Sequence, residues 1–302
     1  MCFAGNTDLG LSSYVKSQNI GRQKTTMLHS IAILDHPKKP ETHAVAAQID
    51  AEVQRLGVQS YRARSWDVTT LVDLVPKADL IIVLGGDGST LRAARAAAPM
   101  NKPVVAINFG RLGFLSEMTP ENWREQLPYF VQGDYWIEER LMLCVECWRG
   151  SERLSRHDAL NDAVVGRGSL ARVVRAETFI DGAPLTTYSC DGLIVSTPTG
   201  STAYALAAGG PILPPHLKNF VVVPIAPHLS LEKPVILSQG STIEIVVHTD
   251  HSAGMSADGQ TEVPLRDGDR VLVRASEHVA KFARVQGPDY FYRTLQRRLA
   301  RC

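Results

Sequence analysis

One segment, residues 78–98, limits most strongly what this chain can fold into. It reads Ala-Asp-Leu-Ile-Ile-Val-Leu over 78–84, then Gly-Gly-Asp-Gly-Ser-Thr over 85–90, then Leu-Arg-Ala-Ala-Arg-Ala-Ala-Ala over 91–98. An apolar run followed by glycines and an alanine-rich stretch predicts a strand, a tight turn and the first turn of a helix. Unpaired N–H groups and the helix dipole attract anions at such a helix start. We therefore predict an α/β unit whose turn is the size of a phosphate group.

Asp87 is the unusual residue of this turn. A carboxylate would repel phosphate oxygens, so it is better suited to hold a divalent cation or to take a proton from an attacking hydroxyl. The same residues also occur in ordinary turns, because glycine permits positive φ and aspartate favours turn positions. The Walker pattern is absent from the chain, and Leu91 stands where the third glycine of Gly-x-Gly-x-x-Gly would be. Neither standard nucleotide motif explains the turn, which indicates phosphoryl transfer.

Strand and helix signals alternate through residues 27–127. Apolar runs predict strands at 27–34, 58–64 and 102–108, and an amphipathic pattern predicts a helix at 42–56. This β-α alternation implies a parallel sheet covered by helices, with ligands bound beyond the carboxyl ends of the strands. Residues 27–127 are therefore predicted to form a Rossmann-like α/β nucleotide-binding domain.

The pattern changes after residue 127 to short strands separated by turns such as Asp181-Gly182. We expect 128–285 to form a β-rich, sandwich-like domain. Residues 286–302 are expected to hold a helix that packs back on the N-terminal domain, because its apolar side chains form one stripe. The strands expected in the second half are 137–148, 172–180, 192–196, 220–224, 242–248 and 270–274.

Composition excludes several classes of protein. The 302 residues carry a formal net charge of +1, which gives no general attraction to nucleic acid or acidic membranes. Five scattered cysteines do not make a secreted disulfide framework, and there is no apolar stretch of about 18 residues that could span a membrane. We expect a cytoplasmic protein with no nucleic-acid or membrane partner. Residues 1–26 are polar and aperiodic, and are expected to be a flexible extension.

A hydroxyl-rich loop follows the apolar run that starts at residue 192. Residues 191–204 read Asp-Gly-Leu-Ile-Val-Ser-Thr-Pro-Thr-Gly-Ser-Thr-Ala-Tyr, and a small-residue stretch comes next. The hydroxyl groups of this loop could bind ribose hydroxyls and an amide, while Gly200 permits close approach of the backbone. Ser201 or Thr202 could instead cap the helix without any ligand. The hydroxyl side chains are Ser196, Thr197, Thr199, Ser201, Thr202 and Tyr204.

Asn161 and Asp162 stand side by side just before another apolar run. Such a pair is often only a turn. Its amide and carboxylate could also bind both hydroxyls of a ribose, because a carboxylate accepts hydrogen bonds from two O–H groups. The residues alone leave both interpretations open.

In combination, the turn at 85–88, Gly-x-Leu-Gly-Phe-Leu at 110–115, the Asn-Asp pair at 161–162 and the loop at 191–204 resemble the NAD kinase family. The Gly-Gly-Asp-Gly turn alone is shared with diacylglycerol-type lipid kinases and 6-phosphofructokinases, whereas the long Ser/Thr loop is much more specific. The resemblance extends from about residue 27 to residue 299. It implies an enzyme that transfers a phosphoryl group from ATP or polyphosphate to the 2′-hydroxyl of the adenosine ribose of NAD.

By this resemblance Asp87 would be the catalytic base toward that hydroxyl, and the glycines of its turn would hold the donor phosphates with a divalent ion, expected to be Mg²⁺. Asn161 and Asp162 would contact ribose and adenine groups. Arg92 would either meet a phosphate or be a solvated helix residue. Ser189 stands where several relatives carry arginine or lysine, which leaves the preference between NAD and NADH open. The residues expected to bind substrates are Gly85, Gly86, Gly88, Arg92, Phe114, Asn161, Asp162, Arg172, Asp191, Thr202, Ala203, Tyr204, Ala207 and Gln260.

The resemblance also implies a homodimer or homotetramer in which a neighbouring subunit completes the NAD site. No set of metal-ligating side chains is expected. Two other functions stay open. A lipid or sugar kinase of the same superfamily would lack the full Thr-Pro-Thr-Gly-Ser-Thr-Ala-Tyr loop, and a non-catalytic NAD(H) sensor would have no need of the carboxylate at Asp87.

Overall fold

The computed structural model describes residues 27–110, 113–168 and 173–300, so the predicted extension at 1–26 and Arg172 lie outside the described residues. The N-terminal half of the chain is built on parallel strands. β1 pairs with β2 and β3, and β3 pairs with β4, which gives the order β2-β1-β3-β4. The strands are β1 (Ser30–Asp35), β2 (Gln59–Arg64), β3 (Leu80–Gly85) and β4 (Pro103–Asn108).

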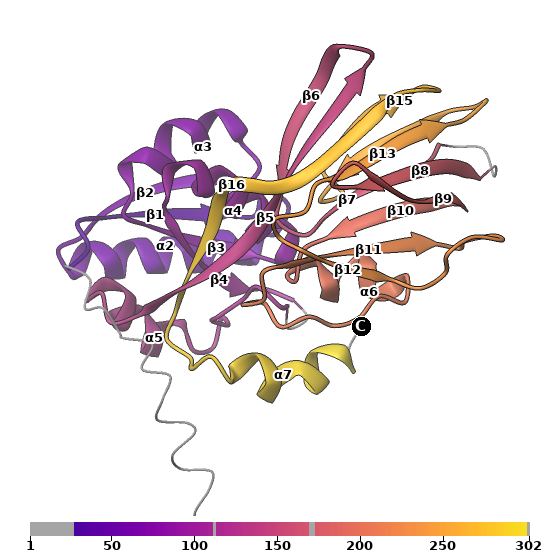
Figure 1. Ribbon diagram of the computed structural model, residues 1–302. Coiled ribbons are helices and arrows are strands. Elements are labelled where there is room, and N and C mark those ends of the chain that lie inside the picture. The colour runs from indigo at the N-terminus through magenta and orange to yellow at the C-terminus, as the bar shows by residue number, and fades with distance from the viewer. Residues whose placement is uncertain (1–26, 111–112, 169–172, 301–302) are drawn as a thin grey trace, which may run out of the picture.

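Helices cover both faces of this parallel sheet (Figure 1). Ile49 of α2 and Trp123 of α5 belong to the core on one face, and Leu71 of α3 and Ala93 of α4 belong to the core on the other. β3 is buried along its whole length because both of its faces are covered, which explains its unbroken apolar sequence. The helices are α2 (Pro40–Arg55), α3 (Val68–Leu74), α4 (Asp87–Ala97) and α5 (Trp123–Val131), with 3-10 turns η1 (Val75–Lys77) and η2 (Ala98–Met100).

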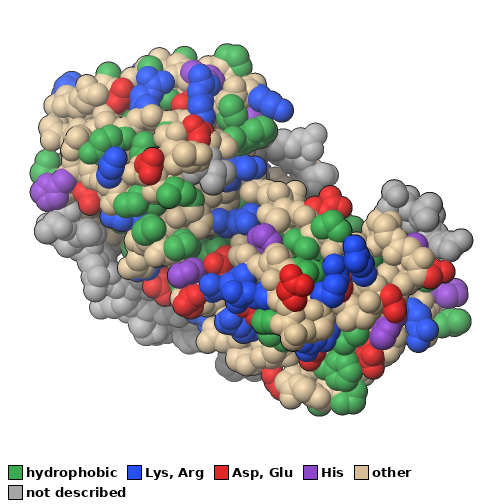
Figure 2. Space-filling model, turned by 90° about the horizontal axis from the view of Figure 1, so that it is seen from above, with side chains coloured by type: hydrophobic (Ala, Val, Ile, Leu, Met, Phe, Trp, Pro, Cys, Tyr) green, Lys and Arg blue, Asp and Glu red, His purple; other side chains and the backbone are tan. Residues whose placement is uncertain are grey.

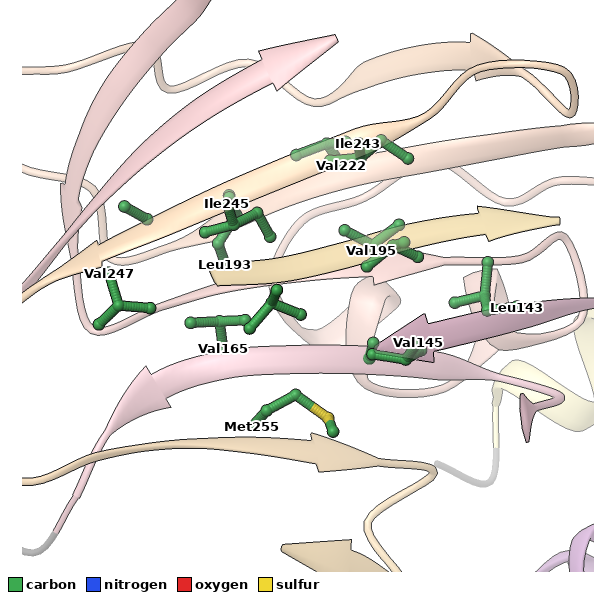
Figure 3. Close-up of a cluster of buried hydrophobic side chains, with 14 of the residues drawn as sticks. Leu143, Val145, Val165, Leu193, Val195, Val222, Ile243, Ile245, Val247 and Met255 are labelled. Carbon is green, nitrogen blue, oxygen red and sulfur yellow. The ribbon is translucent and has the colours of Figure 1, made fainter. Parts of the chain in front are cut away.

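The C-terminal half is a sandwich of two sheets. One sheet has the order β12-β11-β10-β7-β14-β15, and β13, β8 and β9 lie in the facing sheet. Their inner side chains form one buried core, in which Val165, Val195 and Met255 of the first sheet meet Val145 and Ile245 of the second (Figure 3). The elements are β5 (Trp136–Arg149), β6 (Glu152–Ala159), β7 (Asp162–Arg167), β8 (Val174–Ile180), β9 (Ala183–Cys190), β10 (Gly192–Ser196), η3 (Gly200–Thr202), α6 (Tyr204–Ala207), β11 (Asn219–Ile225), β12 (Val235–Ser238), β13 (Ile243–His248), β14 (Ala253–Ala257) and β15 (Thr261–Leu265).

A single long strand, β16 (Arg270–Arg284), joins the two halves (Figure 1). Its first residues pair with β13 of the sandwich, and Lys281 and Phe282 pair in parallel with β4. The parallel sheet therefore continues into the sandwich. The prediction of a strand at 270–274 was too short, because a register shift between Ala275 and Val279 interrupts the regular pattern of side chains.

The predicted fold class is confirmed: a parallel α/β part, a β-rich sandwich and a closing helix, α7 (Tyr290–Leu299). The Asp181-Gly182 turn is also confirmed, since both residues have the positive φ values, 52° and 80°, of a two-residue hairpin turn. No helix in the described ranges is long and apolar enough to cross a membrane.

Candidate active site

Asp87 lies where β3 ends and α4 begins, at the first residue of the helix. Its Oδ2 accepts a hydrogen bond from the backbone N–H of Phe114, 3.1 Å away. Removal from water raises the pKa of Asp87, while N–H groups of Phe114 and Leu115 and the charges of Arg298 and Arg140 act to lower it. A carboxyl group with a raised pKa is suited to accept a proton near neutral pH.

Gly113 is the residue that lets this carboxylate take its place. A Cβ atom on Gly113 would lie 2.6 Å from Cγ of Asp87 and still closer to Oδ1. Only glycine therefore fits opposite the Asp87 side chain. Gly113 belongs to the Gly-x-Leu-Gly-Phe-Leu motif at 110–115, but no role in the site was predicted for it. The signal was available, because this glycine directly precedes Phe114 in a glycine-containing turn after β4.

The three glycines of the Asp87 turn are not alike. A Cβ on Gly85 would lie 2.8 Å from Oγ of Ser89, so Gly85 lets the strand pack closely on the helix. Within the described part of the chain, a Cβ on Gly86 or Gly88 would meet no atom within 4 Å. The surface above Gly86 and Gly88 is therefore open to a ligand, and their predicted contact with phosphate stays a prediction.

The Asn161-Asp162 pair is held by a second aspartate, Asp258. The Asp258 carboxylate accepts hydrogen bonds from the backbone N–H groups of Leu160 and Asn161, at 3.0 and 2.7 Å. Asn161 lies in a bend and Asp162 begins β7, and the contact of the pair with a ribose stays a prediction. Burial, with the nearby charge of Asp258 second, raises the pKa of Asp162 to about 7.

Gln260 connects this cluster to the Asp87 turn. Its Nε2 donates to the backbone oxygen of Gly88 at 3.2 Å, and its Oε1 accepts from Arg95 of α4 at 3.5 Å. Arg95 also lies 3.8 Å from the Asp258 carboxylate. The turn between β14 and β15 thus brings the Asn161-Asp162 pair and the start of α4 together. Sequence reasoning missed Asp258 and Arg95.

The Ser/Thr loop packs directly against Asn161. The N–H of Thr197 donates to the backbone oxygen of Asn161 at 2.9 Å, and a Cβ on Gly200 would lie 2.5 Å from the Asn161 carbonyl carbon. Gly200 is therefore needed for this close approach. The loop, the Asn161-Asp162 pair and the Asp87 turn form one continuous region.

Several hydroxyl groups of the loop are turned inward. Ser196, Thr197 and Ser201 are fully buried, and their side chains donate to backbone oxygens of Asn161, Leu160 and Pro198. The expectation that these hydroxyls face a ribose is therefore wrong; they brace the loop instead. The capping alternative is wrong as well, because Ala203 occupies the N-cap position of α6 and makes no side-chain hydrogen bond there.

The later residues of the loop reach the surface. Thr202 and Ala203 are partly exposed, Ala207 is exposed, and Tyr204 keeps 47% of its surface exposed. An exposed aromatic ring beside a braced loop is suited to contact a ligand. The roles predicted for these residues stay predictions.

Asp191 lies apart from the other predicted site residues. In the register of β7 and β10, Asp162 pairs with Ser196 whereas Gly166 pairs with Gly192. Asp191 therefore lies at the opposite end of β10 from the loop, about 17 Å away at the rise of an extended strand. It forms an ion pair with Arg167 at 3.1 Å.

Arg92 lies against the ring of Trp66. Its guanidinium carbon lies 5.4 Å from the centre of the Trp66 ring. Arg92, Arg95 and Arg156 line a groove of about 480 Å³ beside α4 and β6. Lys and Arg side chains gather across the middle of the face shown in Figure 2.

Comparison with known proteins gives a consistent result. The family model described as the ATP-NAD kinase N-terminal domain matches residues 12–135, and the model of the C-terminal domain matches residues 160–285. The chain is 38% identical over 275 residues to an NAD kinase of Chloroflexus aurantiacus, covering 91% of this chain and 100% of that protein. It is 37% identical over 274 residues to an NAD kinase of Dehalococcoides mccartyi, covering 90% and 96%.

Two solved structures have the same fold. An NAD kinase from Archaeoglobus fulgidus in complex with ATP superposes with a TM-score of 0.73 at 29% identity, covering 89% of this chain and 98% of that one. Yeast NADH kinase complexed with NADH superposes with a TM-score of 0.75 at 24% identity, covering 91% and 89%. The chain therefore belongs to the NAD kinase family.

Proposed function

We propose that this chain converts NAD to NADP by transferring a phosphoryl group from ATP to the 2′-hydroxyl of the adenosine ribose. The relatives that it matches over most of its length are NAD kinases, and the Archaeoglobus relative was solved with ATP. The observation that carries the proposal is the Asp87 carboxylate, held at the start of α4 by the N–H of Phe114.

Asp87 acts as the general base. A ribose hydroxyl is a poor nucleophile near neutral pH, so the carboxylate accepts its proton as the bond to phosphorus forms and ADP leaves. The first-turn N–H groups and the dipole of α4 stabilise the negative charge on the transferred group. Gly86 and Gly88 leave room for that group because a Cβ at either position would meet no atom of the described residues within 4 Å.

The acceptor lies against the Asn161-Asp162 pair and the exposed end of the Ser/Thr loop. The backbone of this pair is fixed by Asp258, and Gln260 holds it beside Gly88. Fixed ligand groups orient the ribose hydroxyl toward the transferred phosphoryl group. Thr202, Ala203, Tyr204 and Ala207 contact the adenine or the nicotinamide half of NAD.

A divalent ion, Mg²⁺, would be held mainly by the donor phosphates, since Mg²⁺ is usually bound by substrate phosphates, water and one or two carboxylates. The described residues hold no group of three or more His, Cys, Asp or Glu side chains that could form a metal site. When bound, the ion neutralises charge on the phosphates. The basic groove lined by Arg92, Arg95 and Arg156 attracts a polyanionic donor, whether ATP or polyphosphate.

The enzyme works in the cytoplasm as a homodimer or homotetramer. Asp191 lies at the end of β10 opposite the end beside Asp162. This separation supports an arrangement in which a neighbouring copy of the chain supplies Asp191 to the NAD site. Sedimentation velocity checks the assembly, and a monomer that is fully active would contradict it.

Substitution of Asp87 tests the proposed reaction. Asp87→Asn should lower kcat by about 10²- to 10⁴-fold, because general base catalysis contributes that much, while the Kd for NAD changes little. Asp73→Asn, which neutralises an exposed aspartate of α3, is the matched control. NADP formation is followed with NAD, ATP and Mg²⁺. Near-normal turnover of Asp87→Asn would remove this residue from the role of base.

Assays of the wild-type protein distinguish the three candidate functions. Formation of NADP supports the proposed reaction. Phosphorylation of a diacylglycerol or a hexose phosphate in its place would identify a lipid or sugar kinase. Binding of NAD without turnover under all donor conditions would identify a sensor.

A further inference from the structure

The loop that holds Asp87 is itself held by the C-terminal helix. Arg298, in the last turn of α7, is 3% exposed and donates from Nη1 to the backbone oxygen of Phe114 at 3.3 Å. Its guanidinium lies 5.3 Å from the centre of the Phe114 ring and 5.2 Å from that of Tyr290. Phe291 of the same helix contacts the Phe114 ring, with 6.3 Å between ring centres.

Phe114 thus connects two groups that are distant in sequence. Its N–H donates to Asp87, and its carbonyl oxygen accepts from Arg298. A shift of Phe114 therefore moves the hydrogen bond that orients the Asp87 carboxylate. The planar guanidinium both donates to the carbonyl and covers the ring, and a lysine cannot make both contacts in one geometry.

The neighbouring residues of the loop are fixed independently of Arg298. Arg284 of β16 donates to the backbone oxygen of Leu115 at 3.0 Å and to Glu117 at 3.2 Å. Loss of Arg298 therefore leaves the loop attached at Leu115 and Glu117. The expected effect of such a loss is local, at Phe114 and at the carboxylate that Phe114 holds.

Electrostatic interactions also connect Asp87 with the C-terminal helix. The charges that act on the Asp87 carboxyl are those of Arg298 from α7 and Arg140 from β5, and both lower its pKa against the effect of burial. The N–H groups of Phe114 and Leu115 act the same way. α7 also lies outside residues 12–135 and 160–285, the ranges matched by the two family models.

We propose that Arg298 is a positioning residue for catalysis, which acts through Phe114 to set the orientation of the Asp87 carboxylate. This inference rests on the proposed function of Asp87 as the base. It assigns the C-terminal helix a role in turnover, in addition to its role in closing the fold.

Two substitutions separate the charge of Arg298 from its geometry. Arg298→Met removes both, so kcat at neutral pH should fall about tenfold or more while KM for NAD stays near that of the wild type. The acidic limb of the kcat–pH profile should move to higher pH, because loss of a nearby cation favours the protonated carboxyl. Arg298→Lys should lower kcat with the acidic limb unmoved, since the charge is kept.

Arg293→Met is the matched control, because it removes an exposed guanidinium from the same helix. Thermal unfolding is measured for every variant. If Arg298→Met does not fold, the kcat and the pH profile of Arg298→Lys decide whether the inference holds. The inference is overturned if a folded Arg298→Met has the kcat and pH profile of Arg293→Met, or if Arg298→Lys retains wild-type kcat. Failure of the wild-type enzyme to make NADP would instead overturn the proposed function.

Discussion

Gly113→Ala is a one-carbon test of the active-site geometry. The added Cβ would lie 2.6 Å from Cγ of Asp87, whereas ordinary contact begins near 3.4 Å, so the gap must open by at least about 0.8 Å. The N–H of Phe114, which donates to the Asp87 carboxylate, would move as this gap opens. A misplacement of about 1 Å costs about 100-fold in rate, equivalent to about 2.7 kcal/mol of barrier. We therefore expect kcat of Gly113→Ala to fall about 100-fold, with little change in KM for NAD.

The assay couples NADP formation to an NADP-specific dehydrogenase at saturating ATP, Mg²⁺ and NAD. Gly110→Ala is the control, because among the described residues its Cβ would meet only Nζ of Lys39, at 3.8 Å. This variant should retain most of the wild-type activity. If Gly113→Ala keeps kcat within about threefold of Gly110→Ala while remaining folded, the close approach does not position the base and the reasoning is refuted.

Two further predictions concern stability. Because burial raises the pKa of Asp162 from near 3.8 to about 7, the folded protein binds more protons than the unfolded chain in this window, and the free energy of unfolding falls as pH rises through it. Asp162→Asn should therefore gain stability relative to wild type between pH 4 and 7, by at most about 4 kcal/mol in urea unfolding; a difference independent of pH would contradict this. Arg284→Met should lose about 3–5 kcal/mol, because it leaves the buried carboxylates of Glu117 and Glu138 without their shared partner. A loss no larger than that of Arg293→Met would count against a buried ion cluster.

The sequence predicted the parallel part of the fold well and the edges of the sandwich poorly. β3 is buried on both faces, so its apolar run marks it without any knowledge of its neighbours. β6 and β9 have few buried residues, and neither gives a clear alternation of apolar and polar residues. α3 is short and was missed for a similar reason, since 7 residues are too few for a periodic pattern.

The candidate site was predicted where chemistry is local and missed where contacts are long-range. Asp87 stands out because a carboxylate in a glycine-rich turn is unusual in itself. Gly113 and Arg298 act only through tertiary contacts, and Arg298 lies 184 positions from the Phe114 oxygen that it binds. The role of the Ser196 hydroxyl was predicted wrongly for the same reason. A hydroxyl group is suited to a ribose site, and only the burial of Ser196 in the folded chain shows that its hydroxyl faces inward.

The continuity of β16 limits how the enzyme can admit its substrates. Two lobes joined by a flexible linker open by rotating about it, but here one strand is hydrogen-bonded to β13 at its start and to β4 near its end. Rotation of one half against the other would have to bend that strand, most easily at the register shift between Ala275 and Val279. Entry and release of substrates are therefore expected to depend on movements of surface loops, with the two halves staying in a nearly fixed relation.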